Sequence, residues 1–317
     1  LDTEEDDEIG VGCAGGVDVT AEKYYKEQDA PENTTTYSIK VKGLQGGHSG
    51  MDIIKGLGNA NKMMNRILYK CQAVMHIASV QGGSLRNAIP RESVATVVVE
   101  NLNEAAFTSE FKRIAKHINE EYALLEPALE ISCQKSENTA EKVMVPASQE
   151  QFLKTLYGLH NGVYRMSPAI ADLVETSNNI AKVLVKEGSI KIECLTRSSV
   201  NSSKLDLANT LKSVFNLGGF EVTFSGEYPG WAPNMDSPIL KVLDSLYEKL
   251  HGEKAHVAAC HAGLECGILG QNYPKMDMIS FGPTIKGAHS PDERASISST
   301  QKFWQFVIEI LKEIPKK

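Results

Sequence analysis

The sequence predicts an α/β protein in which a doubled α+β domain is inserted into a second, mostly parallel domain. Three observations predict this class. Segments with strand-like alternation and segments with helical periodicity follow one another along the 317 residues. Two consecutive stretches repeat nearly the same order of elements. The residues beyond 226 change to one helix per strand, which is typical of a parallel sheet covered by helices.

The first unit of the doubled domain begins with the alternating strand TTYSIKVKG at 35–43, followed by the glycine-rich loop LQGGHSGMD at 44–52. Asn103 is expected to cap a long helix over 103–125. The other elements expected here are a helix over 53–69 and strands over 73–80, 92–100 and 128–134. The order is therefore strand, helix, strand, strand, helix, strand.

The second unit repeats this order without the first strand. Its expected elements are a helix over 148–160, strands over 179–187 and 189–198, a helix over 203–215 and a strand over 220–226. Gly188 marks the turn between its first two strands. Two such units, each with helices on one face of an antiparallel sheet, predict a doubled domain over residues 17–226.

The remaining residues predict the second domain. The elements expected in its C-terminal part, 227–317, are a helix over 237–252, a strand over 256–260, a short helix after HAGLECG at 261–267, a strand over 276–282 and a helix over 299–314. Residues 1–16 are expected to form a strand-end loop that belongs with this part. Because so few strands make a poor sheet, we expect the earlier strands of this domain to lie outside the chain.

Composition and charge limit the possible partners. No apolar run reaches the roughly 18 residues that a membrane span needs, so we expect no membrane partner. The formal net charge is −7, and Lys and Arg are scattered rather than clustered, which argues against a nucleic-acid surface. The six cysteines are far apart in sequence with no C-x-x-C pair, which predicts free thiols in a reducing cytosol. Small molecules or proteins remain as partners.

Two residues are candidate metal ligands. His289 lies in the loop SFGPTIKGAHSPDER after a predicted strand. Neutral imidazole is the commonest metal ligand, and α/β sheets bind ligands at strand ends; the alternative is an ordinary surface histidine. Asp2 is either a ligand or one of several carboxylates that keep an acidic loop solvated.

Three further residues are candidates for binding a substrate. The glycines around His48 let the backbone approach a ligand, and its imidazole could donate to an oxyanion; the alternative is a flexible turn. The Asn87 amide could be a second donor, or could be satisfied by its own turn. Arg197 ends a predicted strand, where its guanidinium would suit a carboxylate or form a surface salt bridge.

Together, several stretches resemble one family. They are DTEEDDEIGVGCAGG, VKGLQGGHSGMDIIKGLGNANK, GGSLRNAIPRE, VETSNN, YPGW, HAGLECG, MDMISFGPT, HSPDE and LKEIP, and they span the whole chain. Their order and approximate spacing resemble bacterial aminoacylhistidine (Xaa-His) dipeptidases, which are cytosolic dinuclear zinc exopeptidases. The resemblance implies an incomplete zinc-exopeptidase catalytic domain with an inserted doubled lid domain.

The resemblance also implies that LDTEE corresponds to a position about one third into the enzyme. The preceding part would carry the remaining zinc ligands and the general base. Asp2 and His289 match one terminal ligand on each of two zinc ions, although other divalent ions could serve. Since a catalytic zinc normally needs about three protein ligands, this chain alone is expected to bind zinc weakly and to hydrolyse little.

By the same resemblance, His48 and Asn87 would stabilise the tetrahedral oxyanion when the lid closes, and Arg197 would bind the C-terminal carboxylate of a small peptide substrate. His261 and Glu265 in HAGLECG would line the substrate site. The resemblance implies a cytoplasmic homodimer. Whether His48 acts within its own chain or on a partner is left open by the sequence.

Two alternatives also stay open. The chain could be a non-catalytic lid module that binds peptides or dimerises. The enzyme could instead be a related amide hydrolase, either a deacylase or a dipeptidase of broad specificity.

Overall fold

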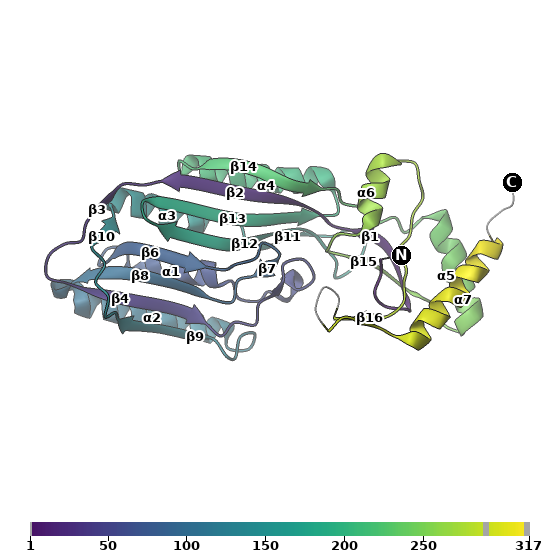
Figure 1. Cartoon of the computed structure of the whole chain (residues 1–317), viewed down its shortest axis with the longest axis horizontal. Coiled ribbons are helices and arrows are strands. Elements are labelled where there is room, and N and C mark those ends of the chain that lie inside the picture. The colour runs from purple at the N-terminus through teal and green to yellow at the C-terminus, as the bar shows by residue number, and fades with distance from the viewer. Residues whose placement is uncertain (1, 288–291, 314–317) are drawn as a thin grey trace.

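One sheet of nine strands dominates the computed structural model, which describes residues 2–287 and 292–313 (Figure 1). Its strands run in the order β14-β2-β13-β12-β6-β8-β4-β9, and β11 pairs with β12 beside this path. The strands are β2 (Gly15–Tyr24), β4 (Thr34–Lys42), β6 (His76–Gly82), β8 (Ser93–Glu100), β9 (Glu130–Lys135), β11 (Gly162–Met166), β12 (Val174–Lys186), β13 (Ser189–Ser198) and β14 (Glu221–Tyr228). All their pairings are antiparallel.

The sheet has two halves with the same strand order. The first half runs β6-β8-β4-β9 and the second runs β12-β13-β2-β14. The strand that the sequence lacked in the second unit is therefore β2, which comes from residues before the first unit. Its residues Val17, Val19 and Ala21 are fully buried, and the polar residues between them point to the other face.

The two halves join through β6 and β12. Val183, Leu184 and Val185 of β12 pair with Gly82, Gln81 and Val80 of β6. The result is a continuous sheet without an open edge between the halves.

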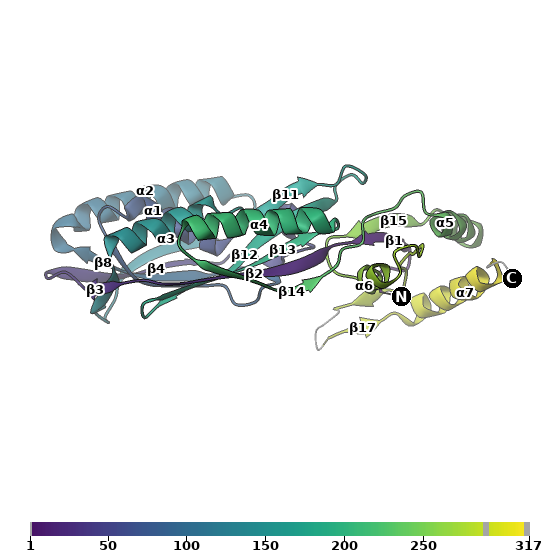
Figure 2. The same ribbon diagram turned by 90° about the horizontal axis from the view of Figure 1, so that it is seen from above.

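Four helices cover one face of this sheet, as Figure 2 shows. They are α1 (Ala60–Cys71), α2 (Glu104–Tyr122), α3 (Pro146–Gly158) and α4 (Asn201–Leu217). A single apolar core lies between the helices and the sheet and includes Phe107 of α2, Phe152 of α3 and Phe215 of α4. Both halves of the sheet thus share one core.

The expected helix over 53–69 is divided in the structure. A short 3-10 helix, η1 (Ile53–Lys55), ends at Gly56 in the left-handed conformation with φ 67°. The α-helix begins only at Ala60, because the Asn59 side chain accepts hydrogen bonds from the amides of Asn61 and Lys62. A second 3-10 helix, η2 (Asn101–Asn103), precedes α2, so Asn103 flanks that helix without a side-chain capping bond.

The C-terminal part lies at the other end of the molecule (Figure 1). Here β1 (Glu8–Cys13) and β15 (His256–Cys260) form a parallel pair. Ile9 and Val11 of β1 pack against α5 (Pro238–His251) and Phe306 of α7 (Ile297–Glu313). The smaller elements are β16 (Ile285–Lys286), β17 (Arg294–Ala295) and α6 (Glu265–Asn272).

Two local predictions for this part were wrong. Residues 1–16 are not a loop throughout, because Glu8–Cys13 forms β1 and β2 starts at Gly15. The segment 276–282 is not a strand, since only Ser280 bridges to Gly10, in an antiparallel manner. The free state predicted for the six cysteines is confirmed. Among the described residues, no helix has the length and apolar character needed to cross a membrane.

Candidate functional site

The candidate site starts with two loops of the first half of the sheet that are held together. The short strands β5 (Gly47–His48) and β7 (Ala88–Ile89) pair antiparallel, with His48 opposite Ala88. In addition, the Ser49 amide donates to the Asn87 carbonyl at 2.7 Å. His48 and Asn87, which are 39 positions apart in sequence, are thereby placed side by side.

The surroundings of His48 fix which ring nitrogen is an acceptor. Nδ1 accepts hydrogen bonds from the amides of Gly50 at 3.2 Å and Met51 at 3.1 Å. In the neutral ring the proton is therefore on Nε2. Nε2 lies 3.4 Å from Nη2 of Arg197, which is also a donor. Two donors thus converge on one point, an arrangement that suits a shared anionic or carbonyl oxygen.

Arg197, near the end of β13, is almost completely buried, with 4% of its surface exposed. Its Nη1 donates to the Tyr228 hydroxyl at 2.7 Å and its Nε to Ser49 Oγ at 3.4 Å. Burial lowers the pKa of Arg197. Within the described residues no carboxylate lies within ion-pair distance of its guanidinium. The alternative of a surface salt bridge is therefore wrong.

His261 follows β15 and lies against the same group. Its Nε2 is 2.7 Å from Ser177 Oγ of β12, and the residue is 5% exposed. Burial, together with the charge on Arg197, lowers the pKa of His261 to about 3, so the ring is neutral at physiological pH. Gly50 allows this approach, because a Cβ there would lie 2.1 Å from the His261 carbonyl oxygen.

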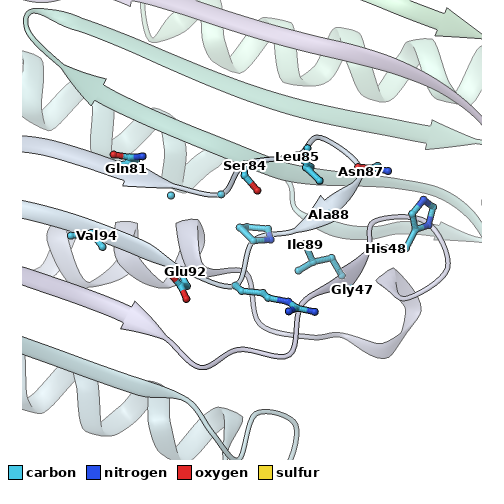
Figure 3. Close-up of a pocket in the computed structure, with 14 residues that line it drawn as sticks. Gly47, His48, Gln81, Ser84, Leu85, Asn87, Ala88, Ile89, Glu92 and Val94 are labelled. Carbon is cyan, nitrogen blue, oxygen red and sulfur yellow. The ribbon is translucent and has the colours of Figure 1, made fainter. Parts of the chain in front are cut away.

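A groove of about 980 Å³ opens beside the two loops. Figure 3 shows His48 and Asn87 at the same end of this groove, with Gln81 and Val94 at the other. The turn at Asn87 is closed by the Ala88 amide and the Leu85 carbonyl, so it does not depend on the exposed Asn87 side chain.

The structure describes fewer contacts for the two candidate metal ligands. Asp2 Oδ2 accepts a hydrogen bond from the Glu265 amide at 2.9 Å, at the start of α6. Glu265 itself is exposed. His289 lies outside the described residues. Among residues 2–287 and 292–313 there is no group of three His, Cys, Asp or Glu side chains that could hold a metal ion.

The structure therefore unites His48, Asn87, Arg197 and His261 in one place and puts Asp2 beside Glu265. Sequence reasoning missed the residues that hold this group, namely Ser49, Ser177 and Tyr228. The stretches HSG, VETSNN and EYPGW contain these residues, but the sequence of these stretches indicates no function for them. Their contacts join segments up to 148 positions apart, which no local pattern shows.

Comparisons with known proteins add to this geometry. Residues 39–125 match a protein-family model described as a peptidase dimerisation domain. The chain is 37% identical over 318 residues to the cytosol non-specific dipeptidase of Escherichia coli, a match that covers all of this chain and 65% of that protein. Its structure matches aminoacylhistidine dipeptidase from Vibrio alginolyticus with a TM-score of 0.93 and 38% identity, over 99% of this chain and 64% of that one.

A more distant relative is succinyl-diaminopimelate desuccinylase from a Sulfurovum species. It is 23% identical over 128 residues, which cover 40% of this chain and 34% of that protein. The chain spans somewhat less than two thirds of the two dipeptidases that it matches from end to end.

Proposed function

Because the chain is homologous over its whole length to two dipeptidases, we propose that it forms the lid and the C-terminal part of a metal-dependent dipeptidase. The enzyme hydrolyses the peptide bond of dipeptides, with Xaa-His dipeptides preferred. One observation carries the proposal, namely the buried guanidinium of Arg197 with no carboxylate partner among the described residues.

A buried charge is costly unless an opposite charge or several hydrogen bonds compensate it. Among the described residues, Arg197 has neutral partners, Tyr228 and Ser49, on two of its three nitrogens. The third, Nη2, points to the same place as His48 Nε2. A substrate carboxylate at this point would complete the hydrogen bonds of the guanidinium. Arg197 is thus the receptor for a free C-terminus.

His48 and Asn87 act on the reacting carbonyl. Because His48 Nδ1 accepts from backbone amides, Nε2 is the ring nitrogen that would donate, and the exposed Asn87 amide supplies a second donor from the same end of the groove. Donors held in place before the reaction stabilise the oxyanion without reorganisation, and losing one such donor slows a hydrolase about 100- to 1000-fold. Because Arg197 and His48 meet within one chain, these donors do not require a second subunit.

His261 and Glu265 line the substrate site. The low pKa of His261 keeps its ring neutral, so it adds no positive charge beside Arg197. Its Nε2 is already paired with Ser177, which fixes the plane of the ring. His261 therefore contributes shape and polarity to the pocket rather than a proton.

Divalent metal ions, two zinc ions in this proposal, supply the activated water when they are bound. Asp2 suits a ligand role, since the Glu265 amide orients its carboxylate and no described residue donates to its other oxygen. His289 would supply the second ligand. The described residues alone do not make a complete metal site, and the other ligands must come from the rest of the enzyme.

The match of residues 39–125 to a dimerisation domain supports a homodimer. The cytosolic relative supports a cytoplasmic enzyme that acts on small peptides.

Two measurements test the proposed function. The whole enzyme that contains this chain should hydrolyse Ala-His faster than Ala-Leu, and both much faster than an N-acetyl amino acid. A preference for the N-acetyl amino acid would favour a deacylase and overturn the proposal. The 317-residue chain alone should retain almost no zinc after exhaustive dialysis, as measured by elemental analysis; about two zinc ions per chain would contradict the ligand assignment.

A further inference from the structure

Beyond the donors themselves, the structure contains a side chain that holds one of them in place. Asn179 lies on β12, in the second half of the sheet, and is 1% exposed. Its Nδ2 donates to the carbonyls of Arg86 at 3.2 Å and Ala88 at 2.8 Å. These are the two residues on either side of Asn87. The Asn179 side chain therefore holds the backbone of the Asn87 loop by a hydrogen bond on each side of Asn87.

The orientation of the Asn179 amide follows from its partners. Two carbonyl oxygens can only accept, so the NH₂ group must face them. On the opposite side, Asn59 Nδ2 donates to Asn179 Oδ1 at 3.4 Å. Asn59 is itself fixed, because its Oδ1 caps α1 and its Nδ2 also donates to Asn161 and Ile180. The amide is thus set by a buried network and not by solvent.

With these contacts, three consecutive carbonyls of the loop are paired with other parts of the lid. Those of Arg86 and Ala88 accept from Asn179, and that of Asn87 accepts from the Ser49 amide. The Arg86 side chain adds a second anchor, since it lies 3.3 Å from carboxylate oxygens of Asp18 on β2 and Glu193 on β13. The exposed Asn87 side chain makes none of these contacts and lines the groove.

We propose that Asn179 is a positioning residue, which aims the Asn87 amide at the reacting carbonyl through the backbone on both sides of it. This inference rests on the proposed function for the role of Asn87. In this proposal, the second half of the sheet supplies the side chain that holds a loop of the first half in place. A displacement of about 1 Å in such a group can cost about 100-fold in rate.

The test uses the whole enzyme that contains this chain, with the variants Asn179→Ala and Asn179→Asp, which both lack the two donated hydrogen bonds. Asn178→Ala is the matched control. Asn178 is the neighbouring residue, fully buried, and it also makes two hydrogen bonds, to His160 and Thr196, but none to the Asn87 loop. We expect kcat for Ala-His to fall roughly 10- to 100-fold in the Asn179 variants, with KM nearly unchanged. Asn178→Ala should keep kcat within about threefold.

A double variant separates positioning from general damage. If Asn179 acts through Asn87, then Asn87→Ala with Asn179→Ala should lose no more activity than Asn87→Ala alone. Losses that multiply would overturn the proposal. An equal loss of kcat in Asn178→Ala would do so as well. Failure of both Asn179 variants to fold, with Asn178→Ala folded, would mark Asn179 as a purely structural residue and would also overturn it.

A second readout does not depend on catalysis. Hydrogen exchange of the backbone amides over residues 85–89, measured without substrate, should be faster in Asn179→Ala than in the wild type and in Asn178→Ala. Unchanged exchange would overturn the positioning role. If the wild-type enzyme hydrolysed no dipeptide, the proposed function would fail, while this measurement would still decide whether Asn179 holds the loop.

Discussion

The two halves of the sheet have the same strand order but contribute different things to the site. The first half presents His48 and Asn87 on loops next to the groove. The second half presents Arg197 and Asn179 at buried positions on strands. In the proposed function, the groups that would meet the reacting carbonyl therefore sit on loops, and the groups that would orient them or bind the substrate carboxylate sit on the rigid strands.

The halves also differ in how the chain builds them. The first half is continuous from β4 to β9, whereas one inner strand of the second half, β2, precedes the first half in sequence. The pairing of Gly15 with Ser198 closes a very long loop. Contacts of such sequence separation form late and slowly, because the loop entropy must be overcome first. The strands of the second half thus come from chain segments on both sides of the first half.

The largest expected effect concerns the unfolding of the two halves of the sheet, which we expect to occur in one transition. Phe107→Ala in the first half and Phe215→Ala in the second remove fully buried rings from one shared core. Each should lower the free energy of unfolding by about 3–5 kcal/mol. In denaturant titrations followed by circular dichroism, both should shift the same transition of the lid.

Leu102→Ala and Leu217→Ala are the controls, because these side chains are 81% and 85% exposed. They should shift the transition very little. A lid transition that splits in two, with each phenylalanine affecting only one part, would show that the halves are independent.

The next effect concerns the buried charge of the second half. Arg197→Met should reduce kcat/KM for Ala-His by roughly 100-fold, since hydrogen bonds to charged groups contribute about 1.5–3 kcal/mol. Because the substitution removes an uncompensated buried charge, the thermal midpoint should stay the same or rise. Parallel kinetics and calorimetry check both expectations.

The substrate offers a matched control for this variant. The C-terminal amide of Ala-His lacks the carboxylate, so the wild-type enzyme should hydrolyse it far more slowly than Ala-His. Arg197→Met should treat the two almost alike. If the variant still prefers the free carboxylate, then another residue binds it.

A smaller effect depends on pH. Burial lowers the pKa of His261 from 6.5 to about 3, so the unfolded state takes up a proton at a higher pH than the folded state does. The stability that the neutral ring contributes is complete above pH 6.5 and is lost as the pH falls towards 3. Between pH 7 and pH 4 this amounts to roughly 3 kcal/mol at most.

Replacing His261 with Gln should remove this part of the acid sensitivity, as measured by the denaturant midpoint at pH 7 and pH 4. His117→Gln, at an exposed position of α2, should leave the wild-type pH dependence in place. An unchanged pH dependence in His261→Gln would contradict the assignment.

The smallest expected effect lies where the two halves touch through their helices. Lys62 of α1 donates from Nζ to the carbonyls of Leu156, Tyr157 and Leu159, at 2.9–3.0 Å, around the C-terminal end of α3. Lys62→Met leaves these carbonyls without that donor and should cost about 1–2 kcal/mol of unfolding free energy. The exposed Lys70→Met should cost almost nothing; equal losses would mean that the contact between α1 and α3 is of no importance.

Much of the fold was predictable because its signals are local. The strand expected over 92–100 is β8 (Ser93–Glu100), and the helix expected over 103–125 is α2 (Glu104–Tyr122). The expected helix over 53–69 starts too early, because the left-handed Gly56 and the Asn59 cap set the start of the α-helix at Ala60. The strand β2 could have been found, since Val17, Val19 and Ala21 alternate with polar residues.

By itself, the sequence determined the two repeated units, the glycine-rich loop at His48 and the identities of the candidate site residues, since periodicity, turn chemistry and motifs are written in neighbouring positions. Only the tertiary structure decided that β2 completes the second half, that Arg197 is buried without a carboxylate partner among the described residues, and that Asn179 holds the Asn87 loop. These facts depend on contacts between residues up to 183 positions apart. Such contacts arise from the packing of whole elements against one another, which leaves no pattern in any one segment.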